Sequence, residues 1–413
     1  MARTASAQVD RIAARGSREP KVEGPVGAKF DVIVIGLGAV GSATAWQLAR
    51  RGARVLGLDR FSPPHDRGSS HGHTRVTRLA VGEGPEYVPL VMRSHQIWRE
   101  IQAATGQSLY VATGGVVMGP REGQVALHGQ SDFVGRTIEI ARQHGIAHDV
   151  LDPQQLRERF PAFLTRGDER CYFEHEAGFL RPEACVAAQL GLARQAGAQL
   201  RVDEPALQLT GAGSEVTVRT AGGSYVAAQA IVCAGAWLPR LMGPPFATML
   251  KVQRQTLFWF EPEDESMYLP GSFPVFIWAH GSTATDLFYG FPIAPGQAGV
   301  KVATEQYDTE SEPDRMERTV SAAEAAQLHA RHVQGRLQGV TSRLLAAVAC
   351  PYTVAPHARF VVTRAQTVPQ AIVVSACSGH GFKHSAALGE ALAQQALEGR
   401  SKIDLQPFGL ASR

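Results

Sequence analysis

Four residues near the start of the chain have the types and spacing that bind a dinucleotide. Gly36, Gly38 and Gly41 form G-x-G-x-x-G, in which successive glycines allow a tight turn, a close approach to a diphosphate and close packing of a helix on a strand. Asp59 follows about twenty residues later, where a carboxylate accepts hydrogen bonds from a ribose hydroxyl group. The spacing predicts an adenine dinucleotide site, which either NAD or FAD would satisfy.

The residues around these glycines supply the elements that must position them. A continuous apolar run at 32–35 predicts a buried parallel strand, and residues 39–51 have apolar side chains at helical spacing. A second apolar run at 55–58 ends at Asp59. Because the chain contains 42 glycines, the glycine pattern alone is weak evidence, and its context makes it specific. The alternative is a Rossmann-like unit whose glycines serve packing alone and that binds no dinucleotide.

A second glycine turn lies near the end of the chain, between another predicted strand and helix. Gly379 and Gly381 leave consecutive backbone amides free to face a carbonyl group or an anion, and Phe382 and Lys383 follow directly. A purely structural turn would explain the glycines but not the lysine. We expect Lys383 and Arg78 to hold a carboxylate, because each charge-assisted hydrogen bond contributes about 1.5–3 kcal/mol.

The loop after Asp59 also carries residues that can do chemistry. Prolines and glycines interrupt regular structure here, and His71, His73, Arg75 and Arg78 lie close together in the sequence. One interpretation is a solvated basic loop. Its place beyond the carboxyl end of a parallel strand, where open α/β sheets bind ligands, favours a ligand site.

Composition narrows the class of protein. The chain has 413 residues, of which 44% are hydrophobic, so it can bury a large core and divide into two domains. A net charge of +3 gives no support for nucleic-acid binding, and no apolar stretch reaches the roughly twenty residues of a membrane span. Five cysteines without a C-x-x-C pair fit reduced thiols and a cytoplasmic location better than a disulfide framework.

Three motifs give the chain a family resemblance. GSSHGHTRVTR followed by GEGPEYVPL, CPYT at 350–353 and CSGHGFKHS occur in this order and resemble the monomeric sarcosine oxidase and N-methyltryptophan oxidase family of FAD-dependent amine oxidases. The resemblance covers about residues 30–400. It implies FAD as cofactor, an N-methyl amino acid such as sarcosine as substrate and O2 as electron acceptor. The implied enzyme is a monomer that forms an imine or aldehyde, an amine and hydrogen peroxide.

The resemblance also implies roles for particular residues. Cys350 corresponds to a cysteine that forms a thioether to the flavin, and Lys301 to a lysine that promotes the reaction of reduced flavin with O2. A buried core thiol and a solvated strand lysine are the plainer alternatives. The other implied residues are Ser69, His71 and Arg75 beside the flavin, Arg78 and Lys383 at the substrate carboxylate, and Tyr289 and Tyr352 in the substrate pocket.

The chain departs from the family pattern at several positions. His73 stands where the family usually has an acid, and His357, Arg359 and Thr363 replace residues of an Asp-x-His-Phe segment and a following acid. These changes put neutral or basic groups near the expected flavin and leave the particular substrate open. Cations around the site would stabilise the reduced flavin, so the chemistry requires neither a Ser-His-Asp pattern nor a metal centre.

The predicted fold is α/β. A discontinuous, Rossmann-like FAD-binding domain of the glutathione-reductase type carries an inserted, mostly antiparallel sheet as substrate domain. The expected segments are 30–110, 170–245 and 345–413 for the FAD-binding domain, and 111–169 and 246–344 for the substrate domain. Residues 1–29 are polar, which predicts a disordered extension. Local patterns further predict strands over 224–226 and 230–234 and a helix over 321–345.

Two other functions remain compatible with these residues. One is a dehydrogenase of the same fold that passes electrons to another acceptor, or a deaminating amino acid oxidase. The other is a flavin-binding subunit without turnover.

Overall fold

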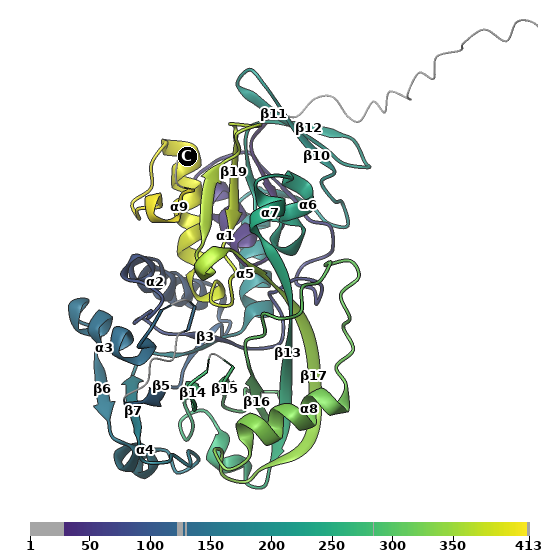
Figure 1. Ribbon diagram of the computed structural model, residues 1–413. Helices are drawn as coiled ribbons and strands as arrows, with labels where there is room; N and C mark the ends of the chain where they lie inside the picture. The colour runs from purple at the N-terminus through teal and green to yellow at the C-terminus, as the bar shows by residue number, and fades with distance from the viewer. Residues whose placement is uncertain (1–28, 122–126, 129, 284, 411–413) are drawn as a thin grey trace, which may run out of the picture.

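The computed structural model describes residues 29–121, 127–128, 130–283 and 285–410. The predicted extension, 1–29, lies outside them apart from Lys29. Two eight-stranded sheets and one three-stranded sheet organise the described chain. Figure 1 shows the first large sheet in the upper half with helices against it, and the second in the lower half with the long strands β13 and β17.

The first sheet has a parallel core in the order β9, β2, β1, β12, β19. These strands span Gln199–Arg201, Val55–Leu58, Phe30–Ile35, Ser224–Val232 and Ala371–Ser375. A hairpin of β10 (Gln208–Ala212) and β11 (Glu215–Arg219) pairs with the first half of β12, and β18 (Val361–Arg364) pairs antiparallel with β19. β12 is one strand, where the sequence predicted two, because Ala227 and Gln229 also pair with β1.

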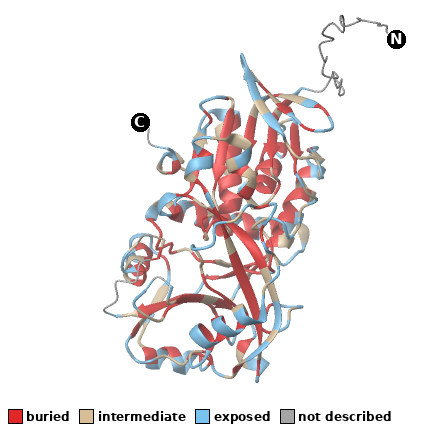
Figure 2. Cartoon of the chain, turned by 45° about the vertical axis from the view of Figure 1, so that its right-hand side comes forward, coloured by how far each residue is buried: buried red, intermediate tan, exposed pale blue. Residues whose placement is uncertain are grey.

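Strand β1 is buried on both faces. Val32 and Val34 pack beneath helices α1 (Ala39–Ala49), α5 (Pro182–Gln195) and α9 (Ser385–Glu398). Ile33 and Ile35 face the opposite side, where α6 (Leu238–Met242) and α7 (Phe246–Met249) cover the sheet. Burial on both faces explains the continuous apolar run in the sequence, and Figure 2 shows the sheet as a buried layer between less buried helices.

The second sheet runs in the order β17, β13, β16, β15, β14, β5, β7, β6. Its strands span Val340–Val354, Lys251–Pro262, Val300–Ala303, Leu287–Phe291, Val275–Ala279, Gly115–Pro120, Glu169–Glu174 and His148–Leu151. Only the pair β5 and β14 is parallel among these described strands. The predicted α/β fold with a mostly antiparallel second sheet is therefore confirmed.

A small third sheet lies between the two large ones. β3 (Arg75–Thr77) pairs with β8 (Gly178–Leu180), and β8 pairs with β4 (Tyr110–Ala112). The remaining α-helices of the described chain are α2 (Val88–Thr105), α3 (Phe133–Gln143), α4 (Pro153–Arg159) and α8 (Ala322–Leu328). None of the helices in the described ranges combines the length and apolar character needed to cross a bilayer.

The structure differs from the sequence prediction in two further respects. β7 and the end of β17 pair within the second sheet, although the predicted boundaries at 170 and 345 assigned them to the FAD-binding domain. The helix predicted over 321–345 ends at Val333, and residues from Val340 form β17. Gly335, with φ of 71°, adopts a left-handed conformation just after the helix ends, and Gly339, with φ of 63°, adopts one directly before β17.

Helices α1 and α9 meet at a glycine. A Cβ atom added at Gly389 would lie 2.4 Å from the Cβ atom of Ala43, whereas one added at Gly191 in α5 would meet no described atom within 4 Å. Gly191→Ala should therefore stabilise the protein by about 0.5–1 kcal/mol, because alanine is the better helix former. Gly389→Ala should destabilise it by about 1–3 kcal/mol through overpacking. Thermal unfolding of the two variants checks this, and equal shifts in Tm would contradict it.

Candidate functional site

The glycine turn between β1 and α1 has two kinds of glycine. A Cβ atom added at Gly36, whose φ is 87°, would lie 2.4 Å from Cys233 O, and one added at Gly41 would lie 1.7 Å from Gly36 O. At Gly38 the nearest atom is Ser70 Oγ at 3.6 Å, and Gly38 lines a large cavity. A side chain at Gly36 or Gly41 would clash with the protein backbone, whereas Gly38 leaves room for a ligand at the N-terminus of α1.

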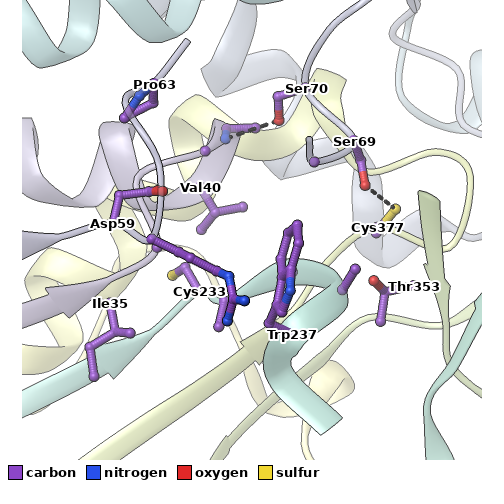
Figure 3. A pocket seen from close by; sticks show the side chains of 18 of the residues that line it. Ile35, Val40, Asp59, Pro63, Ser69, Ser70, Cys233, Trp237, Thr353 and Cys377 are labelled. Carbon is purple, nitrogen blue, oxygen red and sulfur yellow. Dashed lines mark hydrogen bonds between the residues drawn. The ribbon is translucent and has the colours of Figure 1, made fainter. Parts of the chain in front are cut away.

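The large cavity has a volume of about 330 Å³ and lies at the carboxyl ends of β1, β2, β12 and β19. Figure 3 shows Asp59, Trp237, Ser69 and Cys377 around it. The predicted residues that line it are Gly36, Gly38, Asp59, Ser69, Arg75, Tyr352, Gly379, Gly381 and Phe382. They come from the two glycine turns, from the end of β2 and the loop after it, and from β17, so the fold gathers four distant segments around one space.

Asp59 is held rigidly at the wall of this cavity. Its Oδ2 atom accepts a hydrogen bond from Leu37 N at 2.6 Å, and its Oδ1 atom accepts one from Phe61 N at 2.8 Å. Each carboxylate oxygen can accept a second bond. On the opposite wall, Thr353 Oγ1 is buried and has no hydrogen-bond partner among the described residues. This orphaned hydroxyl and the open space at Gly38 fit a bound dinucleotide such as FAD.

A second cavity, of about 70 Å³, adjoins the first. Four residues, Arg75, Tyr352, Gly379 and Phe382, line both cavities. The smaller cavity also contains the predicted residues Arg78, Tyr289, Lys301 and Lys383. The structure thus brings the predicted substrate residues together on one side of a wall, with the predicted dinucleotide residues on the other. Lys383, which we expected to contact both ligands, lines only the smaller cavity.

Lys301 is buried in β16 between two aromatic rings of neighbouring strands. Its Nζ atom lies 4.5 Å from the centroid of Phe291 and 5.3 Å from that of Trp259. It donates to the carbonyl oxygens of Gly72 at 2.7 Å and Thr74 at 2.9 Å, and to Thr74 Oγ1 at 3.0 Å. Burial, reinforced by the positive charge of Arg75, lowers the pKa of Lys301 well below its usual value.

Arg75 is fixed by the backbone around it. Its Nη1 atom donates to Thr74 O at 2.8 Å and its Nη2 atom to Ser69 O at 2.7 Å. Ser69 Oγ in turn donates to Pro351 O at 2.5 Å, which ties the loop to β17. These bonds hold the guanidinium group at the boundary between the two cavities.

Two predicted flavin neighbours lie behind the cavity walls. His71 is buried but lines neither cavity; burial lowers its pKa to about 4, and its Nε2 atom has no partner within the described chain. Cys350 is also buried and packs with Trp259 and Tyr352. Burial raises the pKa of the Cys350 thiol, and Arg75 opposes that effect. A second thiol, Cys377, which sequence reasoning did not single out, lines the large cavity.

The departures from the family pattern do not line either cavity. His73, His357 and Arg359 are exposed, and Thr363 is half-buried on β18. That they lie beside the flavin therefore stays a prediction, which the lining of the two cavities does not support.

The smaller cavity contains acidic residues that sequence reasoning missed. Arg78 Nη2 lies 2.8 Å from Glu83 Oε2, and Lys383 Nζ lies 3.8 Å from Glu83 Oε1. Burial raises the pKa of Glu83, but Arg78 and Lys383 outweigh it and hold the pKa well below its usual range. Burial lowers the pKa of Lys383 to about 8, although Glu83 opposes it. Arg78 Nε stays buried without a partner in the described ranges.

His128 connects Glu83 to a second carboxylate. Its Nδ1 atom lies 3.3 Å from Glu83 Oε1, and its Nε2 atom lies 2.8 Å from Glu305 Oε2. Burial lowers the pKa of His128, but Glu305 and Glu83 outweigh burial and raise it to about 9. Glu305 follows the end of β16 (Val300–Ala303), and no local pattern in the sequence singles it out.

The charges in the smaller cavity do not cancel. Arg75, Arg78, His128 and Lys383 supply four cations, and Glu83 and Glu305 supply two carboxylates. At neutral pH two positive charges are left over, before any contribution from Lys301. An anion such as a carboxylate would reduce this excess, whereas a further cation would be repelled.

Known proteins provide an independent view of the chain. The profile of the family "FAD dependent oxidoreductase" (DAO) matches residues 31–395. Monomeric sarcosine oxidase of Streptomyces avermitilis is 38% identical over 92% of this chain and 96% of that protein. N-methyl-L-tryptophan oxidase of Salmonella arizonae is 32% identical over 93% of this chain and 99% of that protein.

Solved structures show the same fold. NikD, described as an unusual amino acid oxidase essential for nikkomycin biosynthesis, superposes with a TM-score of 0.80 at 23% identity, over 93% of this chain and 98% of that one. The match of a family profile across most of the chain agrees with the resemblance that the three motifs indicated. The chain belongs to the family of FAD-dependent oxidoreductases that includes the monomeric sarcosine oxidases and the N-methyl-L-tryptophan oxidases.

Proposed function

We propose that the protein is an FAD-dependent oxidase of an N-methyl amino acid such as sarcosine. The observation that carries this proposal is the wall of Arg75, Tyr352, Gly379 and Phe382, which a dinucleotide-sized cavity and a small cationic cavity share. Such a wall lets a substrate in one cavity meet a cofactor in the other. The relatives named sarcosine oxidase support the same assignment.

The residues of the smaller cavity would select and orient the substrate. Arg78 and Lys383 would hold its carboxylate, since Arg78 Nε lacks a partner in the described chain and the cavity carries an excess positive charge. The same charge would favour the neutral amine over the ammonium form, which is the form that can lose a hydride. Bound FAD would supply the chemistry, accepting a hydride equivalent from the carbon beside the amine and passing two electrons to O2.

Lys301 would act in the oxidative half of the reaction. It lines the smaller cavity beside Arg75, and negative charge that develops on oxygen there would favour the protonated form of this buried amine and be stabilised by it. The family resemblance supports the same role. Its bonds to Gly72 and Thr74 also hold the loop that carries Arg75.

The relatives and the thiols also bear on assembly and location. The name of the Streptomyces avermitilis relative describes a monomer, and all five cysteines are free. These observations support a monomer that works in the reducing cytoplasm. The two large sheets support a cofactor domain and a substrate domain, with β7 and β17 in the latter.

Lys301→Met should separate the two halves of the reaction. Sarcosine should bleach the flavin of the wild-type and variant proteins without air at rates within a few-fold of each other. In air the wild type should form peroxide, and the variant should react with O2 at least about tenfold more slowly, since 1.4 kcal/mol of lost charge stabilisation is a factor of ten. Lys251→Met, which removes an exposed lysine of β13, is the control. Undiminished oxygen reactivity in Lys301→Met would exclude the proposed role.

Cys350 should carry the flavin covalently. It lies two residues from Tyr352 on β17, and Tyr352 lines both cavities. After acid precipitation the wild-type protein should keep its yellow colour in the pellet, and Cys350→Ser should release it. Cys377→Ser is the matched control and should keep the colour. Release from Cys377→Ser alone would assign the linkage to the other thiol.

Carboxylate binding should weaken as the pH rises through about 8, the pKa of Lys383. Below that pH the ammonium group is charged and attracts the carboxylate; above it the amine is neutral. Titration with acetate, which has no amine of its own, should show affinity falling about tenfold, because a charged hydrogen bond contributes about 1.5–3 kcal/mol. Lys383→Met should bind acetate weakly at pH 7 and lose this step, keeping only the change near pH 9 from His128. An unaltered pH profile in the variant would contradict the role of Lys383.

A further inference from the structure

His128 forms part of the boundary of the smaller cavity. It lies between β5 and α3, and its side chain is only 4% exposed. Glu83 approaches its ring from the loop after β3, and Glu305 from the segment after β16. Three segments that are distant in the sequence therefore meet at this ring.

The His128–Glu305 pair is packed against the second glycine turn. A Cβ atom added at Gly379 would lie 2.9 Å from Glu305 Oε1 and 3.3 Å from His128 Nε2. The ring centroid of His128 lies 5.0 Å from that of His380. Tyr307, whose ring is partly exposed, donates from its hydroxyl group to Glu305 Oε2 at 2.8 Å. The pair cannot shift toward the turn, and it is tied to its neighbours on the other sides.

The space beside the pair is narrow. The smaller cavity has a volume of about 70 Å³, compared with about 330 Å³ for the large cavity. Sarcosine is among the smallest N-methyl amino acids, whereas an aromatic side chain on the same backbone adds a bulky ring. His128 and Glu305 line this cavity, so a side chain that extends toward them would have to displace His128 and break its two ion pairs, which leaves Glu305 without its cation.

We propose that the His128–Glu305 pair sets substrate specificity, by restricting the cavity to N-methyl amino acids with a very small side chain. The proposal rests on the function proposed above and narrows its substrates to the smallest N-methyl amino acids. Removing either member of the pair admits N-methyl amino acids with aromatic side chains.

The test compares two substrates in the holoenzyme. The quantity measured is the rate constant for anaerobic flavin reduction by N-methylphenylalanine divided by that for sarcosine. The wild type should favour sarcosine at least tenfold. His128→Ala and Glu305→Ala should each raise the ratio at least tenfold, and the double variant should resemble the single ones, because both changes release the same contact.

Two control variants separate cavity size from a general disturbance. His128→Gln keeps a polar side chain of similar length and should change the ratio by less than threefold. His175→Ala removes a half-exposed histidine that contacts Asp149 far from the cavity and should leave the ratio unchanged. Thermal unfolding of each holoprotein establishes that it is folded.

Several outcomes would overturn the proposal. They are equal rates with both substrates in the wild type, and an unchanged ratio in folded His128→Ala and Glu305→Ala proteins. If both alanine variants fail to fold, His128→Asn, which shortens the side chain but keeps a polar group, replaces them; it should raise the ratio, and an unchanged ratio overturns the proposal.

A binding experiment distinguishes failure of this inference from failure of the proposed function. If no N-methyl amino acid reduces the flavin, the proposed function is wrong. The cavity is then tested by titrating the holoprotein with acetate and phenylacetate, read from the flavin absorbance. Acetate should bind at least tenfold more tightly than phenylacetate to the wild type, and the difference should shrink in His128→Ala. Equal binding, or no binding, overturns the inference.

Discussion

The site depends on one buried amine that joins the two large sheets. Lys301 belongs to the second sheet, and its Nζ atom donates to backbone oxygens of the loop that leaves the first. An unpaired amine at this depth would lose its hydration without compensation, so the loop oxygens must be present for β16 to pack as it does. The loop is in turn fixed by that amine. Because it carries Ser69, Arg75 and Arg78, the same contact sets the position of groups in both cavities.

The smaller cavity shows how the buried cations of an anion-binding site can be stabilised when no anion is bound. Arg78 and Lys383 are buried, and cations at that depth need a partner. Glu83 provides it, while His128 and Glu305 extend the pairing across the cavity. A carboxylate that enters therefore competes with a carboxylate of the protein. Its affinity is the difference between the free energy of pairing the cations with the ligand and that of pairing them with Glu83. A small difference allows the product to leave as well as the substrate to bind.

Local patterns predicted much of this architecture. The run at 32–35, the three glycines and Asp59 lie in one continuous stretch, and each has a local physical reason, so the parallel sheet and its turn could be foreseen. Family motifs brought Arg78, Lys301 and Lys383 into view. His128 and Glu305 could not be found in that way, because 177 residues separate them and neither has a local pattern that requires it. The same limit applies to β12, whose middle is completed by pairing with β1.

The order of the chain has a consequence for how the protein acquires its cofactor in the cell. β1 is made first, but β19 and the turn with Gly379 and Phe382 are made near the end. The wall shared by the two cavities is therefore still incomplete when most of the chain has been synthesised. Cofactor loading must be a late event that follows synthesis. The glycine turn between β1 and α1 stays exposed in the nascent chain until then. A chain truncated before residue 371 would lack part of the cavity that binds the flavin.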